Sequence, residues 1–204
     1  WSPDGQSLAF VSARHAEREF DSASDLWVVP ATGGEARQVT TTSGARGAPS
    51  WSPDGAKIAH IHHPDWPANG TLRLIGVDGT GETDASGGID REMGAGGLPG
   101  AVAQPNWLRG GGILTVATDR GESSLWVAGS VADGRWVARE PAMTAWYSVD
   151  RAGLRAAVVS STQLSPAELS VGNLETGARR QLTHFNAAWR DEVGLASAEK
   201  FVVG

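Results

Sequence analysis

The chain has 204 residues, a net charge of −6 and no cysteine. Its length suits one domain or part of a larger one. Without cysteine it can form no disulfide, thiolate zinc site or cysteine nucleophile. The net charge is acidic and no basic cluster occurs, so we expect no nucleic-acid partner. No apolar run approaches the roughly 20 residues of a membrane helix, so we expect no membrane partner either.

The sequence begins with Trp1, and no basic and apolar leader follows it. We therefore expect the chain to be a piece of a longer protein whose targeting signals lie elsewhere. Nothing in the sequence calls for export, so we expect a cytoplasmic location.

The pentapeptide WSPDG occurs twice, at 1–5 and 51–55. Proline presets φ in a turn, aspartate bonds its own backbone, and glycine adopts the positive φ that closes the turn. Apolar residues alternate in the segments that follow, 6–12 and 56–62, which predicts a strand entered through each turn.

A second pattern, consisting of a strand, a glycine turn and another strand, follows each of these strands. It occurs four times, at 25–40, 71–86, 124–140 and 168–183. Degenerate forms of the first motif precede the last two copies, at 106–118 and 146–161. A repeat period of 40–55 residues without intervening amphipathic helices indicates one small sheet laid down again and again.

These units predict an all-β fold, a partial β-propeller of about four blades with four antiparallel strands each. We place the blades at approximately 1–40, 41–86, 87–140 and 141–186, the first without its inner strand, followed by a linker at 187–204. Tryptophans recur at one repeat position, where we expect them to wedge between blades: Trp1, Trp51 and Trp107. An incomplete ring leaves sheet faces uncovered, so we expect self-association through its open ends.

The connections between strands predict two unlike faces. The short turns between strands one and two, and between three and four, fall on one face of the blades. The long loops 13–24, 62–70 and 84–105 fall on the other. Because loops carry binding residues more often than scaffold strands do, we expect this loop face to bind a partner or substrate.

A serine nucleophile of the α/β-hydrolase kind needs a G-x-S-x-G pentapeptide on a strand-turn-helix. The nearest segments, GQSLA at 5–9 and DASGG at 84–88, lack both the full motif and that context. The segment GAGG at 94–97 lacks the residues of a phosphate loop. We expect no catalytic residue and no cofactor in this chain.

Histidines offer a weak metal signal. His60 and His62 share one side of a predicted strand, and Asp65 on the following loop is a third potential ligand. Two imidazoles do not make a site without further ligands and supporting hydrogen bonds, so we expect strand histidines and no metal. We expect His184 to be a surface residue, and His15 lies in a polar loop.

Several segments resemble the propeller of the prolyl oligopeptidase family, in particular its acylaminoacyl-peptidase and dipeptidyl-aminopeptidase branch. The segments 1–12, 25–40 and 51–61 carry the resemblance, and they are similar to TolB-like propellers as well. The tail at 165–203 looks like the last blade of such a peptidase and the passage towards its hydrolase domain. GIDREMG at 88–94 looks like the family's connection between blades.

The resemblance implies a serine peptidase whose Ser-Asp-His triad lies on an α/β-hydrolase domain that follows the propeller. The propeller would cap the active site and admit only short or unfolded peptides. Dipeptidyl peptidases hold the substrate's amino group with propeller glutamates, which makes Glu17 and Glu19 candidate substrate contacts against the alternative of a solvated acidic loop. A TolB-like protein-binding module is the alternative function. A propeller lyase is a third, and it would need histidines from several blades.

Overall fold

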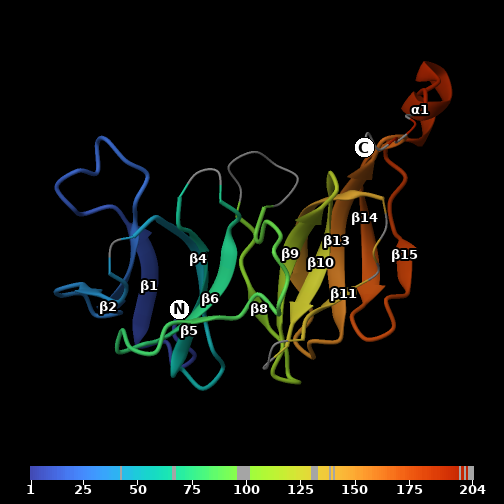
Figure 1. Cartoon of the computed structure of the whole chain (residues 1–204). Helices are drawn as coiled ribbons and strands as arrows, with labels where there is room; N and C mark the ends of the chain where they lie inside the picture. Colours follow the sequence, from blue (N-terminus) through green and yellow to red (C-terminus); the bar gives the residue numbers. More distant parts are fainter. Residues whose placement is uncertain are drawn as a thin grey trace.

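The computed structural model describes residues 1–41, 43–65, 68–95, 102–129, 133–137, 139, 141–197, 199 and 201. Most of these residues lie in strands and tight turns, with one short helix near the C-terminus (Figure 1). The prediction of a mostly β protein is therefore confirmed.

The first two sheets are antiparallel and follow the chain order. The first sheet contains β1 (Ser7–Ser12), β2 (Asp25–Pro30) and β3 (Arg37–Gln38). The second contains β4 (Ala45–Trp51), β5 (Lys57–His63), β6 (Thr71–Gly76) and β7 (Thr83–Asp84).

The remaining strands form one longer sheet made of two antiparallel sets. The third set contains β8 (Asn106–Trp107), β9 (Ile113–Asp119), β10 (Glu122–Ala128) and β11 (Arg135–Val137). The fourth contains β12 (Met143–Val149), β13 (Arg155–Thr162), β14 (Ser165–Asn173) and β15 (Arg179–Gln181). A single parallel residue pair, Ser123 with Met143, joins the two sets. Figure 1 shows all the sets side by side in chain order.

Both WSPDG segments form the same turn. Gly5 N–H donates to the Ser2 carbonyl and Gly55 N–H to the Ser52 carbonyl, each at 2.9 Å. Both glycines have positive φ, 69° and 72°. In each turn the serine hydroxyl donates to the aspartate two residues later at 2.6 Å. The repeated letters thus encode a repeated entry into a strand, as predicted.

Apolar clusters fill the three junctions between consecutive sets. The first junction contains Leu26, Val28, Ile58 and Ile75, with Trp51 packed against them. The second contains Ile61, Leu72, Ile113 and Trp126, with Trp107 at its side. The third contains Leu114, Val116, Leu125, Tyr147 and Val158.

The wedge prediction holds for two of the three recurring tryptophans. Trp51 and Trp107 lie at junctions, and the Trp107 indole N–H donates to the Ser50 carbonyl at 3.2 Å. Trp1 is 72% exposed and belongs to none of the three apolar clusters of the described residues.

One helix, α1 (Ala187–Val193), follows the fourth set and contains no buried residue. Gly194 ends it in a left-handed conformation, with its N–H on the Arg190 carbonyl. The helix lies in the segment where the sequence predicts a linker. The helices in the described part of the chain are too short and too polar to cross a bilayer.

Candidate functional site

The long loops gather at one end of the sheets. The loop 13–24 and the described residues that connect β5 to β6 lie at the top in Figure 1, where α1 also leaves the last set. The WSPDG turn that leads into β5 lies at the opposite end. The end with the long loops is the loop face expected from the sequence.

A hollow of about 430 Å³ opens on this face between the first two sheets. Its lining consists of Asp21–Ala23 from the first loop, Gly44 and Ala45 at the start of β4, and His63–Asp65 and Ala68 from the end of β5 and its loop. We call it the loop-face hollow.

Ser24 ties the walls of the loop-face hollow together. Its N–H donates to the Gly44 carbonyl at 3.1 Å, and its hydroxyl bonds both the carbonyl and the N–H of Arg46. Gly44 has φ +70° and lies so close to the His63 carbonyl that a Cβ would overlap it. The floor of the hollow therefore needs glycine at this position.

Acidic groups and histidines line and flank the loop-face hollow. The Asp21 carboxylate lies 2.9 Å from His15 Nε2 and accepts the Ala23 N–H at 2.9 Å. On the other side, the Glu92 carboxylate accepts the Gly70 N–H at 2.7 Å and lies 3.6 Å from His63 Nε2. The hollow therefore suits a polar or cationic group more than an anion.

The two predicted substrate contacts lie on the loop that forms one wall. Glu17 and Glu19 are exposed, and the Glu19 carboxylate is 3.8 Å from Arg18 Nε. Neither residue lines the loop-face hollow. Their contact with substrate stays a prediction.

The two histidines of β5, His60 and His62, contact a carboxylate and a backbone carbonyl. His60 is fully buried, and its Nε2 lies 3.2 Å from the Glu82 carboxylate. His62 Nε2 lies 2.7 Å from the Ser43 carbonyl, and Asp65 lines the loop-face hollow. In the described residues, no three His, Asp or Glu side chains lie close enough to share a metal ion. His184, expected at the surface, is exposed and lies 3.2 Å from the Gln181 amide, and His15 in the polar loop 13–24 is half-buried.

Beneath the loop face lies a buried polar cluster that crosses the second sheet. Arg46 Nη1 donates to Glu82 Oε1 at 2.5 Å, and Arg73 Nε lies 3.8 Å from the same oxygen. The Arg46 side chain is only 3% exposed. We define Arg46, His60, Arg73 and Glu82 as the Glu82 cluster.

Burial governs the ionisation of His60 in the Glu82 cluster. Burial, with a smaller contribution from the nearby Arg46 charge, lowers the pKa of His60 to about 4, and Glu82 opposes this only in part. His60 is therefore neutral near pH 7. Sequence reasoning noted His60 but missed the cluster. Comparison of the repeats could have indicated it. The paired residues His60 and Arg73 of the second sheet are equivalent to the apolar pair Phe10 and Trp27 of the first.

The serines of the two incomplete nucleophile motifs have structural roles. Ser7 N–H opens β1 by donating to the Ser2 hydroxyl at 2.8 Å. The Ser86 hydroxyl accepts the Leu72 N–H at 3.1 Å, and the residue is 4% exposed. Gly96 and Gly97 of the GAGG segment lie outside the described residues.

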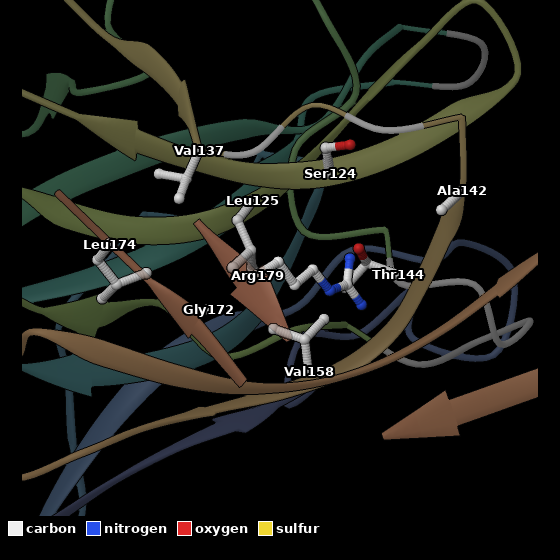
Figure 2. A pocket seen from close by; sticks show the side chains of 9 residues that line it. All are labelled: Ser124, Leu125, Val137, Ala142, Thr144, Val158, Gly172, Leu174 and Arg179. Carbon is white, nitrogen blue, oxygen red and sulfur yellow. The ribbon is translucent and has the colours of Figure 1, made fainter. Parts of the chain in front are cut away.

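A small cavity of about 20 Å³ lies between the third and fourth sets, room for about one water. Figure 2 shows the Arg179 side chain reaching into it between Val158 and Thr144. The Arg179 guanidinium donates to the hydroxyls of Ser160 and Ser170 at 2.6 Å. The cavity belongs to the packing of this junction.

Comparison with known proteins begins with short sequence matches. No family model matches the chain. The uncharacterized peptidase YuxL of Bacillus subtilis is 43% identical over 58 residues, which are 28% of this chain and 8% of YuxL. The Tol-Pal system protein TolB of Alcanivorax borkumensis is 37% identical over 59 residues, 29% of this chain and 12% of that protein.

Solved structures match nearly the whole chain. The acylaminoacyl peptidase of Pyrococcus horikoshii has a TM-score of 0.66 and 20% identity over 95% of this chain. TolB of Acinetobacter baumannii has a TM-score of 0.66 and 18% identity over 90% of it. The fold is that of a β-propeller. These neighbours are the peptidases and TolB-like propellers that the sequence resembles.

The matched propellers are parts of longer chains. The chain spans 28% of the Pyrococcus peptidase and 42% of the Acinetobacter TolB. An oligogalacturonate lyase in complex with manganese shares the fold at a TM-score of 0.64 and 17% identity. At these identities the structures establish the propeller fold, and activity has to be argued from the site.

Proposed function

We propose that this chain is the non-catalytic propeller portion of a serine peptidase, and that its loop face positions and gates peptide substrates for a hydrolase domain. The observation that carries the proposal is the structural match of 95% of the chain to an acylaminoacyl peptidase. The sequence match to the peptidase YuxL supports it. The gathering of the long loops, the loop-face hollow and α1 at one end supports a substrate path there.

The proposal includes the blade arrangement. We take the four sets of strands as four blades of an incomplete ring, approximately 1–40, 41–86, 87–140 and 141–186, with 187–204 leading to the hydrolase domain. The single residue pair between β10 and β12 supports treating the longer sheet as two blades, since the pairing within each set is far more extensive. We also propose a cytoplasmic location, which cell fractionation of the full-length protein tests.

A peptidase assay tests the central proposal. The isolated chain should release no product from short chromogenic peptides, whereas the full-length parent should hydrolyse them. The parent gene should encode G-x-S-x-G and then Asp and His beyond residue 204. A parent without these residues and without activity would refute the proposal.

Glu17 and Glu19 allow a sharper test in the full-length parent. If they hold a substrate's amino group, Glu17→Gln with Glu19→Gln should raise KM for peptides with a free amino terminus and leave acylated peptides unchanged. Equal effects on both kinds of peptide would refute this role. Glu35→Gln, an exposed change in the turn between β2 and β3, is the matched control.

A protein-binding module of the TolB kind is the second candidate. It is favoured by the TolB matches in both sequence and structure. In that case the full-length protein should lack peptidase activity and should retain binding partners through the loop face.

A further inference from the structure

The loop that leads into β6 contains Asn69–Gly70, the single Asn-Gly pair of the sequence. Asparagine is a thermally labile residue. In its spontaneous decomposition, the backbone nitrogen of the next residue attacks the side-chain amide carbon and ammonia is released. Glycine in the next position favours this attack because it has no Cβ to hinder the approach. The surroundings of the Gly70 nitrogen therefore decide how readily the pair reacts.

A carboxylate accepts the proton of this nitrogen. Gly70 is buried, and its N–H donates to Glu92 Oε2 at 2.7 Å. A general base has to lie within about 2.6–3.2 Å of the atom whose proton it takes, so Glu92 is placed to serve as one. Glu92 belongs to the connection between the second and third sets, so the folded chain brings the base to the loop.

Two further contacts hold Glu92 and Gly70 in this position. The other carboxylate oxygen, Glu92 Oε1, lies 3.6 Å from His63 Nε2. The Gly70 carbonyl accepts the Met93 N–H at 3.0 Å. A Cβ at residue 70 would lie 2.5 Å from His63 Cε1 and 2.9 Å from Glu92 Oε1. Because Gly70 has no Cβ, both side chains can approach its nitrogen.

The side chain that carries the reacting carbon is held as well. Asn69 Nδ2 donates to Asp90 Oδ1 at 2.9 Å. Asn69 is exposed, whereas Gly70 is buried. The bond to Asp90 restrains the amide, and its exposure leaves it open to the water that the later step consumes.

The surroundings of the other asparagines lack such a base where the structure gives the bond of the next nitrogen. All of them precede residues with a Cβ: Asn106, Asn173 and Asn186. After Asn173 and Asn186, the next N–H donates to a backbone carbonyl, at 2.9 Å for Leu174 and 3.3 Å for Ala187. A carbonyl takes no proton, so these positions provide internal comparisons for Asn69.

We propose that Asn69 is a self-modification site of the folded chain, with Glu92 as the general base. Glu92 takes the Gly70 N–H proton while the nitrogen bonds to Asn69 Cγ. The bond from Cγ to the side-chain nitrogen breaks, the proton joins that nitrogen, and ammonia leaves a cyclic succinimide. Water then opens either carbonyl–nitrogen bond of the ring and gives aspartate or isoaspartate at residue 69. The inference rests on the geometry of this loop and is independent of the proposed function.

The modification changes the charge and the tethering of the loop face. Asn69 loses the N–H that Asp90 accepts, and two carboxylates then face each other where a hydrogen bond stood. Like charges at such close range repel. We therefore expect the loop, which also carries Ala68 in the lining of the loop-face hollow, to lose its tie to Asp90.

Peptide mapping by mass spectrometry tests the proposal on the purified chain over a time course at neutral pH. Residue 69 should convert to aspartate and isoaspartate at least about tenfold faster in the folded chain than in urea, because unfolding removes the fixed base and nucleophile. Asn106, Asn173 and Asn186 in the same digest should stay intact. A folded rate equal to or below the unfolded rate would overturn the proposal.

Glu92→Gln separates the base from the shape of the loop. Glutamine can still accept the Gly70 N–H but takes no proton, so the folded rate should fall about tenfold and the unfolded rate should not change. Glu35→Gln, exposed in the turn between β2 and β3, should leave both rates unchanged. Circular dichroism checks the fold, and Glu92→Asp, which withdraws the carboxylate, replaces a variant that does not fold. An undiminished folded rate without the Glu92 carboxylate would overturn the proposal.

Discussion

His60 lies at a position where the repeat elsewhere places a residue that carries no charge. The equivalent residues are Phe10 in the first sheet and Thr115 in the third set, and Thr115 is also fully buried. Both ring nitrogens of His60 lack a well-aligned hydrogen bond in the structure. A buried polar group without well-aligned hydrogen bonds lowers the stability of the folded chain. The Glu82 cluster therefore places polar and charged side chains beside an otherwise apolar junction.

The low pKa of His60 predicts acid sensitivity. His60 stays neutral in the folded chain down to a pKa of about 4, whereas the unfolded chain binds the proton near the ordinary value of 6.5. Stability should therefore be complete above pH 6.5 and fall as the pH drops towards 4, by at most about 1.4 kcal/mol per pH unit from this group. Urea unfolding across this range should show a smaller slope in His60→Phe. An unchanged slope in the variant would contradict the assignment.

Breaking the Glu82 cluster should cost more than breaking an exposed pair. Glu82→Gln leaves the buried Arg46 guanidinium without its carboxylate and should lower the free energy of unfolding by about 3 kcal/mol. Asp84, 52% exposed and 3.6 Å from Arg73, provides the control. Asp84→Asn should cost about 0–1 kcal/mol. Equal losses in urea unfolding of the two variants would refute the buried role of Glu82.

At the scale of the elements, close approach of backbone and ring fixes the outer edge of the third set. The Trp126 indole N–H donates to the Ser86 carbonyl at 2.9 Å, and the ring lies against Gly134. A Cβ at residue 134 would overlap the indole. Glycine at residue 134 therefore leaves room for the Trp126 ring, which packs in the second junction and bonds Ser86 in the connection between the second and third sets.

Gly134→Ala should consequently disturb the second junction. We expect a loss of about 1–3 kcal/mol in the free energy of unfolding, with quenching or a shift of tryptophan fluorescence, because the large ring has to move. Gly110 is the matched control, since a Cβ there meets nothing within 4 Å. Gly110→Ala should be neutral or slightly stabilising. A neutral Gly134→Ala would contradict the packing.

The segment that leaves the fourth set is held by one carboxylate of β14. Glu168 accepts hydrogen bonds from the Thr183 hydroxyl and from the backbone and side-chain N–H groups of Asn186. These donors, the Thr183 hydroxyl first, lower the pKa of Glu168 to about 2. Its contribution to holding the segment should be complete above pH 4.5 and lost as the pH falls through 2.

Glu168→Gln should loosen α1 without unfolding the sheets. Hydrogen exchange of the amides in 182–193 should accelerate at neutral pH, while β9 and β13 keep their protection. Glu175→Gln, an exposed change in the turn before β15, should leave exchange unchanged. Unaltered exchange in Glu168→Gln would mean that other contacts hold the helix.

At the scale of the whole molecule, the four sets of strands follow one another in chain order (Figure 1), and an apolar cluster fills each of the three junctions between them. The described sets are therefore held together by packing between neighbours along the chain.

Several features followed from the sequence because they depend on neighbours along the chain. The WSPDG turns, the alternating strands and their fourfold recurrence are local, so their letters alone predicted a mostly β repeat and its likeness to known propellers. Loop lengths also indicated which end would carry the long connections.

Only the tertiary structure decided which side chains meet across strands and sheets. The Glu82 cluster joins residues of β4, β5 and β6 with the turn before β7, and the loop-face hollow joins two sheets. Such contacts depend on register and on which face of a sheet is covered. Periodicity along a strand places His60 on one face of its sheet, but burial, and with it the low pKa, comes from what the neighbouring sheet excludes from water.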